Sequence, residues 1–102
     1  MNLLEQHKTE ITNLCKQYKV QELYAFGSVL DENRFNEQSD IDLIVKFNND
    51  VDVLDYVDLF FGLIENLERV FKRKVDLYTL NPIENRFLRE NIESTKQIVY
   101  AA

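Results

Sequence analysis

Two aspartates near the middle of the chain occupy positions where acidic side chains are uncommon. Asp40 and Asp42 open an apolar run in the segment Ser39-Asp40-Ile41-Asp42-Leu43, although Asp is depleted inside β-strands. Because side chains alternate along a strand, both carboxylates project from the same face, about 6.6 to 7 Å apart along the backbone. Two carboxylates on one face repel each other unless a positive ion lies between them. The spacing therefore indicates a cation site.

A third acid and a glycine-serine turn extend this pattern. Asp76 lies in a second apolar segment, residues 74–79, which we expect to pair in the same small sheet. Three oxygen ligands with no His or Cys nearby favour Mg²⁺ or Mn²⁺ over zinc. Gly27 and Ser28 follow another apolar run, where backbone N–H groups and the Ser hydroxyl can bind a phosphate. Together these residues predict phosphoryl or nucleotidyl transfer assisted by one or two metal ions.

Each part of this set also has a purely structural explanation. Asp40 and Asp42 alone are compatible with a solvated strand entrance, and Ser28 with a simple turn. The run Lys72-Arg73-Lys74 is more often an exposed turn than a phosphate clamp. The ordered combination of Gly-Ser, Asp-x-Asp and one further Asp favours the metal site, because a motif gains weight from its structural context.

Apolar periodicity predicts the helices. Residues 3–18 and 53–71 carry apolar side chains at helical spacing, with charged residues opposite. Asn81 and Pro82 announce a further helix, with Asn81 as N-cap and Pro82 at the first helical position. Gly62, inside the second helix, costs about 1 kcal/mol relative to Ala, so we expect another backbone to come close there.

Short apolar runs predict the strands. The run at residues 41–47 has a continuous apolar centre, which indicates an inner strand covered on both faces. The polar residues 31–39 lack periodicity, which indicates a loop or a loop with one helical turn. We expect an α/β (α+β) fold with a small mixed sheet of three to four strands covered by helices. The predicted strands are residues 23–26, 41–47, 74–79 and the tail 98–100.

Length and composition limit the function classes. The 102 residues, 45% of them hydrophobic, fit one domain over residues 1–102. The net charge of −6 disfavours an extended nucleic acid as partner, because such binding needs many basic contacts. No apolar run is long enough to cross a membrane, and no signal peptide is recognisable. The single cysteine, Cys15, is expected in the core and fits a cytoplasmic protein.

Three segments together resemble a known family. They look like the signature of the minimal nucleotidyltransferases of the polymerase-β superfamily, and the element order agrees along the whole chain. The segments are Phe26-Gly27-Ser28, Ser39-Asp40-Ile41-Asp42-Leu43-Ile44-Val45 and Val75-Asp76-Leu77.

This resemblance implies a nucleotidyltransferase-like fold and an activity. A nucleoside monophosphate would move from an NTP, with ATP as the expected donor, to a hydroxyl, and pyrophosphate would leave. Asp40, Asp42 and Asp76 would be the catalytic, metal-binding residues, with Asp76 also activating the acceptor hydroxyl. Gly27 and Ser28 would hold the phosphates.

The family also suggests a partner. Similar stand-alone prokaryotic proteins are antitoxins in toxin–antitoxin pairs, and they can add AMP to a tyrosine of a HEPN-domain RNase toxin. A HEPN-domain protein is therefore the expected acceptor, and a homo-oligomer is a further assembly open to this chain. Leu54 and Phe61 flank the apolar stripe of residues 53–71. A wide buried face is the favoured interpretation for them, and a contact patch for another chain is the alternative.

The loop after Ser28 departs from the family pattern. Relatives carry a small residue, a basic residue and a Gly there, whereas this chain has Asp31 and Glu32. Arg34, or the basic run at residues 72–74, would then supply the positive charge for the triphosphate. Two other functions stay open: a catalytically weak antitoxin that acts by binding a HEPN toxin, and a small-molecule transferase, which the missing second domain disfavours.

Overall fold

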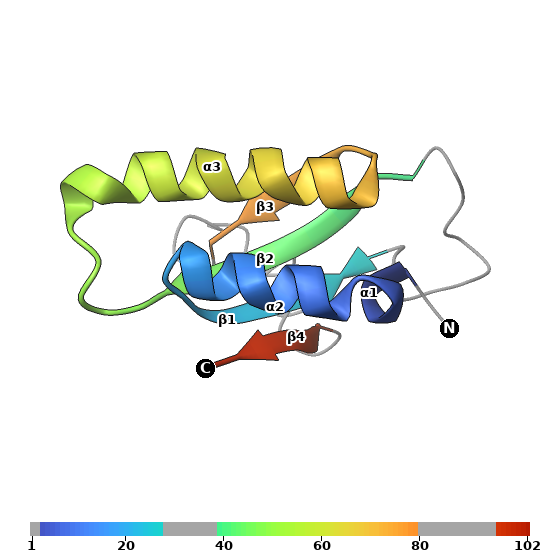
Figure 1. The fold of residues 1–102 in the computed structure, drawn as a ribbon, viewed down its shortest axis with the longest axis horizontal. Helices are drawn as coiled ribbons and strands as arrows, with labels where there is room; N and C mark the ends of the chain where they lie inside the picture. The colour runs from blue at the N-terminus through green and yellow to red at the C-terminus, as the bar shows by residue number, and fades with distance from the viewer. Residues whose placement is uncertain (1–2, 28–38, 80–95) are drawn as a thin grey trace.

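A four-stranded mixed sheet organises the chain, for which a computed structural model describes residues 3–27, 39–79 and 96–102. The strands lie in the order β3-β2-β1-β4 (Figure 1). β1 pairs antiparallel with β2 and β4, whereas β2 and β3 run parallel and are joined through α3, as a parallel pair requires. The predicted α/β fold is confirmed. The elements concerned are β1 (Val20–Phe26), β2 (Ile41–Phe47), α3 (Val53–Phe71), β3 (Val75–Tyr78) and β4 (Gln97–Ala101).

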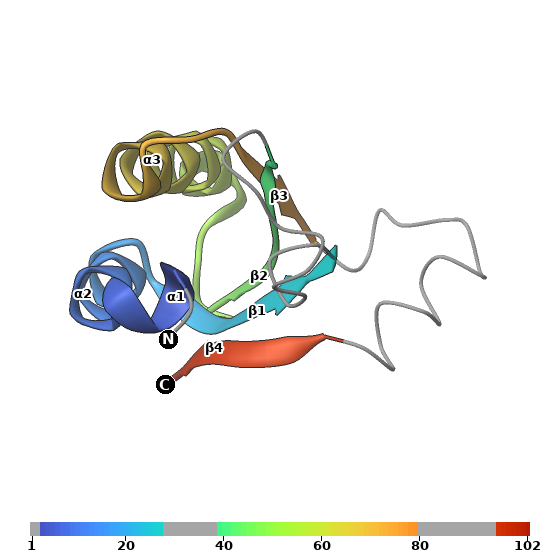
Figure 2. The ribbon, with the colours of Figure 1, turned by 90° about the vertical axis from the view of Figure 1, so that its right-hand side faces the viewer.

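The helices lie on one side of the sheet (Figure 2). α1 (Leu3–Gln6) and α2 (Lys8–Gln17) replace the single helix predicted near the start of the chain. His7 separates them with φ −112° and ψ 21°. Its Nδ1 lies 2.6 Å from Glu10 Oε2, and its ring meets the Phe71 ring edge-on at 5.7 Å between centroids. No helix in the described part of the chain has the length and apolar character to cross a membrane.

α3 begins and ends at the predicted residues. The Asp52 side chain caps its first turn by accepting a hydrogen bond from the Leu54 N–H at 2.9 Å. Lys72, in the left-handed conformation, ends it. Glu68 Oε2 accepts a hydrogen bond from the Val75 N–H at 3.0 Å. This bond joins the last turn of α3 to the first residue of β3, and so helps to position β3 beside β2.

Gly62 marks a close contact, but not the one predicted. A Cβ at this position would lie 2.7 Å from Tyr18 Cε1, so the neighbour is an aromatic ring and not another backbone. Asn66 Nδ2 donates hydrogen bonds to the Tyr18 hydroxyl at 2.7 Å and to the Gly62 carbonyl at 2.8 Å. These contacts pack the C-terminal end of α2 against α3.

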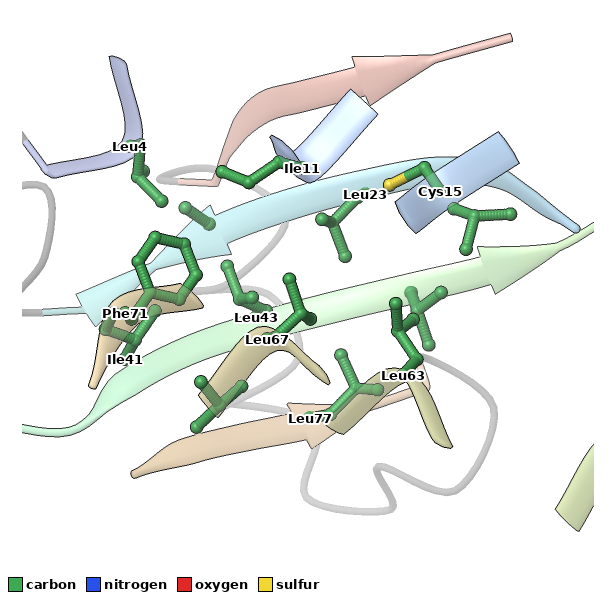
Figure 3. Close-up of a cluster of buried hydrophobic side chains, with 14 of the residues drawn as sticks. Leu4, Ile11, Cys15, Leu23, Ile41, Leu43, Leu63, Leu67, Phe71 and Leu77 are labelled. Carbon is green, nitrogen blue, oxygen red and sulfur yellow. The ribbon is translucent and has the colours of Figure 1, made fainter. Parts of the chain in front are cut away.

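One apolar cluster fills the space between the helices and the sheet (Figure 3). Leu23, Leu43 and Leu67 are fully buried in it, and Cys15 contributes its thiol from α2. Burial raises the pKa of Cys15 to about 12, which agrees with the predicted core position. Alternate residues of β2 and β3 enter this cluster, so the remaining residues of these two strands project from the opposite face of the sheet.

β2 is an inner strand, as predicted from its continuous apolar centre. It lies between β1 and β3, and Leu43 and Val45 belong to the main cluster. Ile44 points to the other face and is still only 1% exposed. β2 is therefore covered on both faces at its centre, and a polar side chain next to Ile44 lies in partly desolvated surroundings.

The outer side of α3 carries an apolar strip, which we call the α3 strip. Its members are 56 to 84% exposed, and they recur at helical spacing on one face of the helix. The favoured prediction of a wide buried face is therefore wrong, and the predicted alternative of an exposed contact patch remains. The α3 strip consists of Val53, Leu54, Val57 and Phe61.

Candidate active site

Asp42 and Asp76 are neighbours across the parallel pair of β2 and β3. Their Cα atoms are register partners, and paired residues of adjacent strands project from the same face. Ile41 and Leu43 pack into the core beneath the helices, so the two aspartates lie on the opposite face. The strand positions predicted from the sequence therefore bring these two carboxylates together.

The surroundings of Asp42 disfavour its ionised form. Burial, the charges of Asp76 and Asp40, and a hydrogen bond with Asp76 together raise its pKa from 3.8 to about 6. A hydrogen bond between two carboxyl groups needs a proton on one of them, so the contact with Asp76 favours the protonated form of Asp42. Asp40, directly before β2, is close enough for its charge to act on Asp42. All three predicted acids thus contribute negative charge to the surroundings of the Asp42 carboxylate.

Gly27 lies directly against the Asp42 carboxylate. It follows β1 with φ +76°, and a Cβ at this position would lie 2.8 Å from Asp42 Oδ2. A side chain here would displace the carboxylate and would also strain the backbone. The sequence predicted a close backbone approach at Gly27. The approach found is to the carboxylate, and a contact with phosphate stays a prediction.

The structure does not describe two of the residues that were predicted to bind phosphate. Ser28 and Arg34 lie outside the described residues. Their predicted roles, the hydroxyl of Ser28 toward a phosphate and the positive charge of Arg34, stay predictions. The end of β1 at Phe26 and Gly27 nevertheless brings the chain to Asp42 immediately before Ser28.

The basic run before β3 contributes a cation to the site. Lys74 Nζ lies 3.7 Å from Asp76 Oδ1. Arg73 Nη1 donates a hydrogen bond to the Ser39 carbonyl at 3.1 Å and so holds the segment that leads into Asp40. The sequence offered this run as a source of positive charge, but it did not indicate which member would face the acids.

Two aromatic side chains border the carboxylates, and sequence reasoning missed both. Phe26 is the register partner of Asp42 on β1, and Tyr78 lies two residues after Asp76 on the same face of β3. Their ring centroids are 5.8 Å apart with the planes inclined at 56°. Burial and the charges of Asp76 and Asp42 raise the pKa of the Tyr78 hydroxyl. The alternation of side chains along β3 could have indicated that Tyr78 lies on the same face as Asp76.

The oxygen donors fit a hard divalent cation. Within residues 3–27, 39–79 and 96–102, no group of three His, Cys, Asp or Glu side chains converges as a metal cage. Mg²⁺, however, is usually held by one or two carboxylates together with substrate phosphates and water, and Asp42 and Asp76 supply such a pair. A cation beside them would relieve the repulsion that raises the pKa of Asp42. A three-carboxylate site that includes Asp40 stays a prediction.

Sequence comparison finds relatives along most of the chain. The model of the nucleotidyltransferase domain family matches residues 8–99. Two candidate protein adenylyltransferases of Methanocaldococcus jannaschii are 35% identical over 91 residues and 36% identical over 93 residues. Each alignment covers 89% of this chain and 85% of the relative.

Solved structures share the fold. A candidate minimal nucleotidyltransferase is 27% identical, with a TM-score of 0.67 over 95% of both chains. A toxin–antitoxin structure with AMP-PNP is 22% identical, with a TM-score of 0.67 over 93% of this chain and 73% of the other. A complex of tri-AMPylated HEPN toxin with MNT antitoxin from Shewanella oneidensis is 20% identical, with a TM-score of 0.63 over 98% and 74%. The chain belongs to the nucleotidyltransferase domain family and is a nucleotidyltransferase.

Proposed function

We propose that this protein moves AMP from ATP to a hydroxyl of a HEPN-domain partner protein in a reaction that depends on Mg²⁺. The observation that carries this proposal is the register pairing of Asp42 with Asp76, with Gly27 against the Asp42 carboxylate. The names of the relatives as candidate protein adenylyltransferases support the reaction type. A fold neighbour in complex with AMP-PNP supports an adenine nucleotide as donor.

In this reaction Asp42 and Asp76 would hold the cation, with Asp40 as an additional ligand. The cation, Mg²⁺ or in its place Mn²⁺, would neutralise the charge of the triphosphate. The acceptor oxygen bonds to the α-phosphorus of ATP while the bond from that phosphorus to the bridging oxygen breaks and releases pyrophosphate. Asp76 accepts the proton that the hydroxyl loses. This assignment rests on the position of Asp76 on the edge strand β3, directly beside Asp42.

The phosphates would bind between the end of β1 and the start of β3. Gly27 and Ser28 would offer backbone N–H groups and a hydroxyl, and Arg34 would offer a positive charge. Lys74 Nζ is already 3.7 Å from Asp76 Oδ1, and its side chain is exposed enough to turn toward a phosphate instead. An ATP donor and a lone, buried thiol both fit a cytoplasmic location.

A transfer assay tests this proposal. The protein is incubated with α-labelled ATP, Mg²⁺ and the protein encoded by the adjacent reading frame. We expect label on the partner protein, and a loss of at least 100-fold for Asp42→Asn, because a charged ligand of the cation would be lost. Asp50→Asn is the matched control, since Asp50 is an exposed acid in the turn after β2, outside the α3 strip. Label that is absent from the partner, or that is equal with Asp42→Asn, would contradict the proposal.

The α3 strip favours a second candidate function, an antitoxin that neutralises a HEPN toxin by binding alone. Leu54 is 84% and Phe61 62% exposed, an arrangement typical of surfaces that contact another chain. Acidic side chains flank the strip, among them Asp55 and Asp58. Two copies of this face would repel each other, so a partner with basic residues around an apolar centre fits better than a second copy.

Growth rescue separates the two candidates. If binding alone neutralises the toxin, the double variant Asp40→Asn, Asp42→Asn rescues growth as well as the wild type, and Leu54→Ser with Phe61→Ser does not. If transfer is required, the Asp double variant fails while it still forms the complex. Neither Leu54→Ser nor Phe61→Ser is expected to change the free energy of unfolding by more than about 0.5 kcal/mol, because the Leu54 and Phe61 side chains are exposed.

A further inference from the structure

An aromatic pair covers the sheet beside the carboxylates. β2 lies between β1 and β3, yet the Phe26 ring of β1 and the Tyr78 ring of β3 approach to 5.8 Å between centroids. Strands two positions apart in a sheet are separated by about 9.5 Å. The two rings must therefore lean toward each other across β2.

Ile44 of β2 lies on the same face of the sheet as these rings. It is the register partner of Tyr78, projects from the same face, and is only 1% exposed. Tyr78 itself keeps 43% of its surface exposed. One side of the Tyr78 ring thus packs on the protein, while another part of its surface is open to a ligand.

The position of this open surface relative to the acids is set by the strand. Tyr78 follows Asp76 by two residues on one face, which is a displacement of about 6.6 Å along β3. That displacement is comparable to the span of a ribose between the α-phosphate and the base of a nucleotide. A nucleotide whose phosphates lie at Asp42 and Asp76 can therefore bring its base to Tyr78.

We propose that Tyr78, supported from the side by Phe26, is the platform on which the base of the donor nucleotide stacks. The inference rests on the proposed function and deepens it, because it assigns a residue to the base. Stacking on an aromatic face tolerates any base, but it is stronger for the larger ring system of a purine. The site is therefore selective for purine nucleotides by contact area.

Binding measurements on two nucleotides test the platform. Calorimetry gives the Kd of ATP and of UTP, each with Mg²⁺, for the wild type and for Tyr78→Leu. We expect a 5- to 10-fold increase of the Kd for ATP in Tyr78→Leu and a smaller increase for UTP. Tyr78→Phe keeps the ring and should stay within twofold of the wild type. Tyr100→Leu makes the same side-chain change on β4, away from β3, and serves as the control.

A fluorescent nucleotide gives a readout that does not depend on affinity. The emission of 2-aminopurine triphosphate falls when its base stacks, so we expect quenching on binding to the wild type and to Tyr78→Phe. At saturation, Tyr78→Leu should restore most of the emission. If Tyr78→Leu does not fold, Phe26→Leu replaces it, and the loss of lateral support should also weaken ATP more than UTP.

The outcomes separate this inference from the proposed function. No binding of ATP with Mg²⁺ by the folded wild type would overturn the proposed function and the inference together. Normal ATP binding by both the wild type and Tyr78→Leu would overturn the platform alone. Equal weakening of ATP and UTP in Tyr78→Leu would also overturn it, because that result indicates a general disturbance of the site.

Discussion

Replacing Asp42 with Asn should stabilise the metal-free protein at neutral pH. The pKa of Asp42 is raised from 3.8 to about 6 by burial and by the charges of Asp76 and Asp40. The folded protein therefore binds this proton more tightly than the unfolded chain. The resulting stability is fully present below pH 3.8, and it is lost as the pH rises through about 6. Asn keeps the shape of the neutral carboxyl group and carries no charge at any pH.

The size of the effect follows from the shift of the pKa. One pKa unit corresponds to about 1.4 kcal/mol, so a rise from 3.8 to about 6 gives an upper limit of roughly 3 kcal/mol. Asp42 is only partly buried, and solvent screens part of the interaction. We therefore expect Asp42→Asn to raise the free energy of unfolding by about 1 to 1.5 kcal/mol at pH 8.

Urea unfolding in EDTA at pH 4.5, 6 and 8 measures this difference. The gain in Asp42→Asn should shrink as the pH falls, because Asp42 of the wild type then recovers its proton. Asp58→Asn, an exposed acid on α3, should show little change across the same range. In a parallel series without EDTA, Mg²⁺ should stabilise the wild type more than it stabilises Asp42→Asn. An Asp42→Asn protein that is less stable than the wild type at pH 8, or a difference independent of pH, would refute this reasoning.

Three further perturbations test separate contacts. Gly27→Ala should lower transfer activity at least tenfold while the helix content in circular dichroism is retained, because its Cβ would lie 2.8 Å from Asp42 Oδ2 and its φ would be strained. Gly62→Ala should destabilise by about 1 to 2 kcal/mol in urea unfolding, although Ala normally favours a helix. In the background Tyr18→Ser the same change should become stabilising. Cys15 should react with a thiol reagent only on unfolding, since burial raises its pKa to about 12.

Much of the fold could be predicted from the sequence in segments where the apolar residues follow one clear pattern. The apolar stripe of α3 gave both helix ends, and the continuous apolar centre of β2 gave an inner strand. The start of β1 was missed: it begins at Val20, whereas the prediction began at Leu23. Gln21 and Glu22 dilute the apolar signal there, and Glu22 is accommodated by accepting a hydrogen bond from the Tyr24 hydroxyl at 2.7 Å.

The site could be predicted only as far as local strand geometry determines it. Alternation along the chain indicated that the aspartates share a face, but the pairing of Asp42 with Asp76 depends on the register of two strands. Contacts between side chains of distant elements could not be predicted, because they leave no periodic pattern in the sequence. Lys74 could not be distinguished from its basic neighbours, and the meeting of Phe26 with Tyr78 required the strand order.

The oxygen donors around Asp42 suit a divalent cation, and the charges around Asp42 explain why this site should also require one. The side chains of Asp40, Asp42 and Asp76, with the Lys74 ammonium beside them, carry formal charges that sum to −2 (−3 plus +1). A divalent ion balances that charge, whereas the Lys74 side chain is too exposed to do so alone. Without an ion, the fold lowers the local charge by keeping a proton on Asp42 up to about pH 6. Ion binding below about pH 6 therefore competes with one proton on Asp42, and a Mg²⁺ affinity that does not rise between pH 5 and pH 7 would contradict this account.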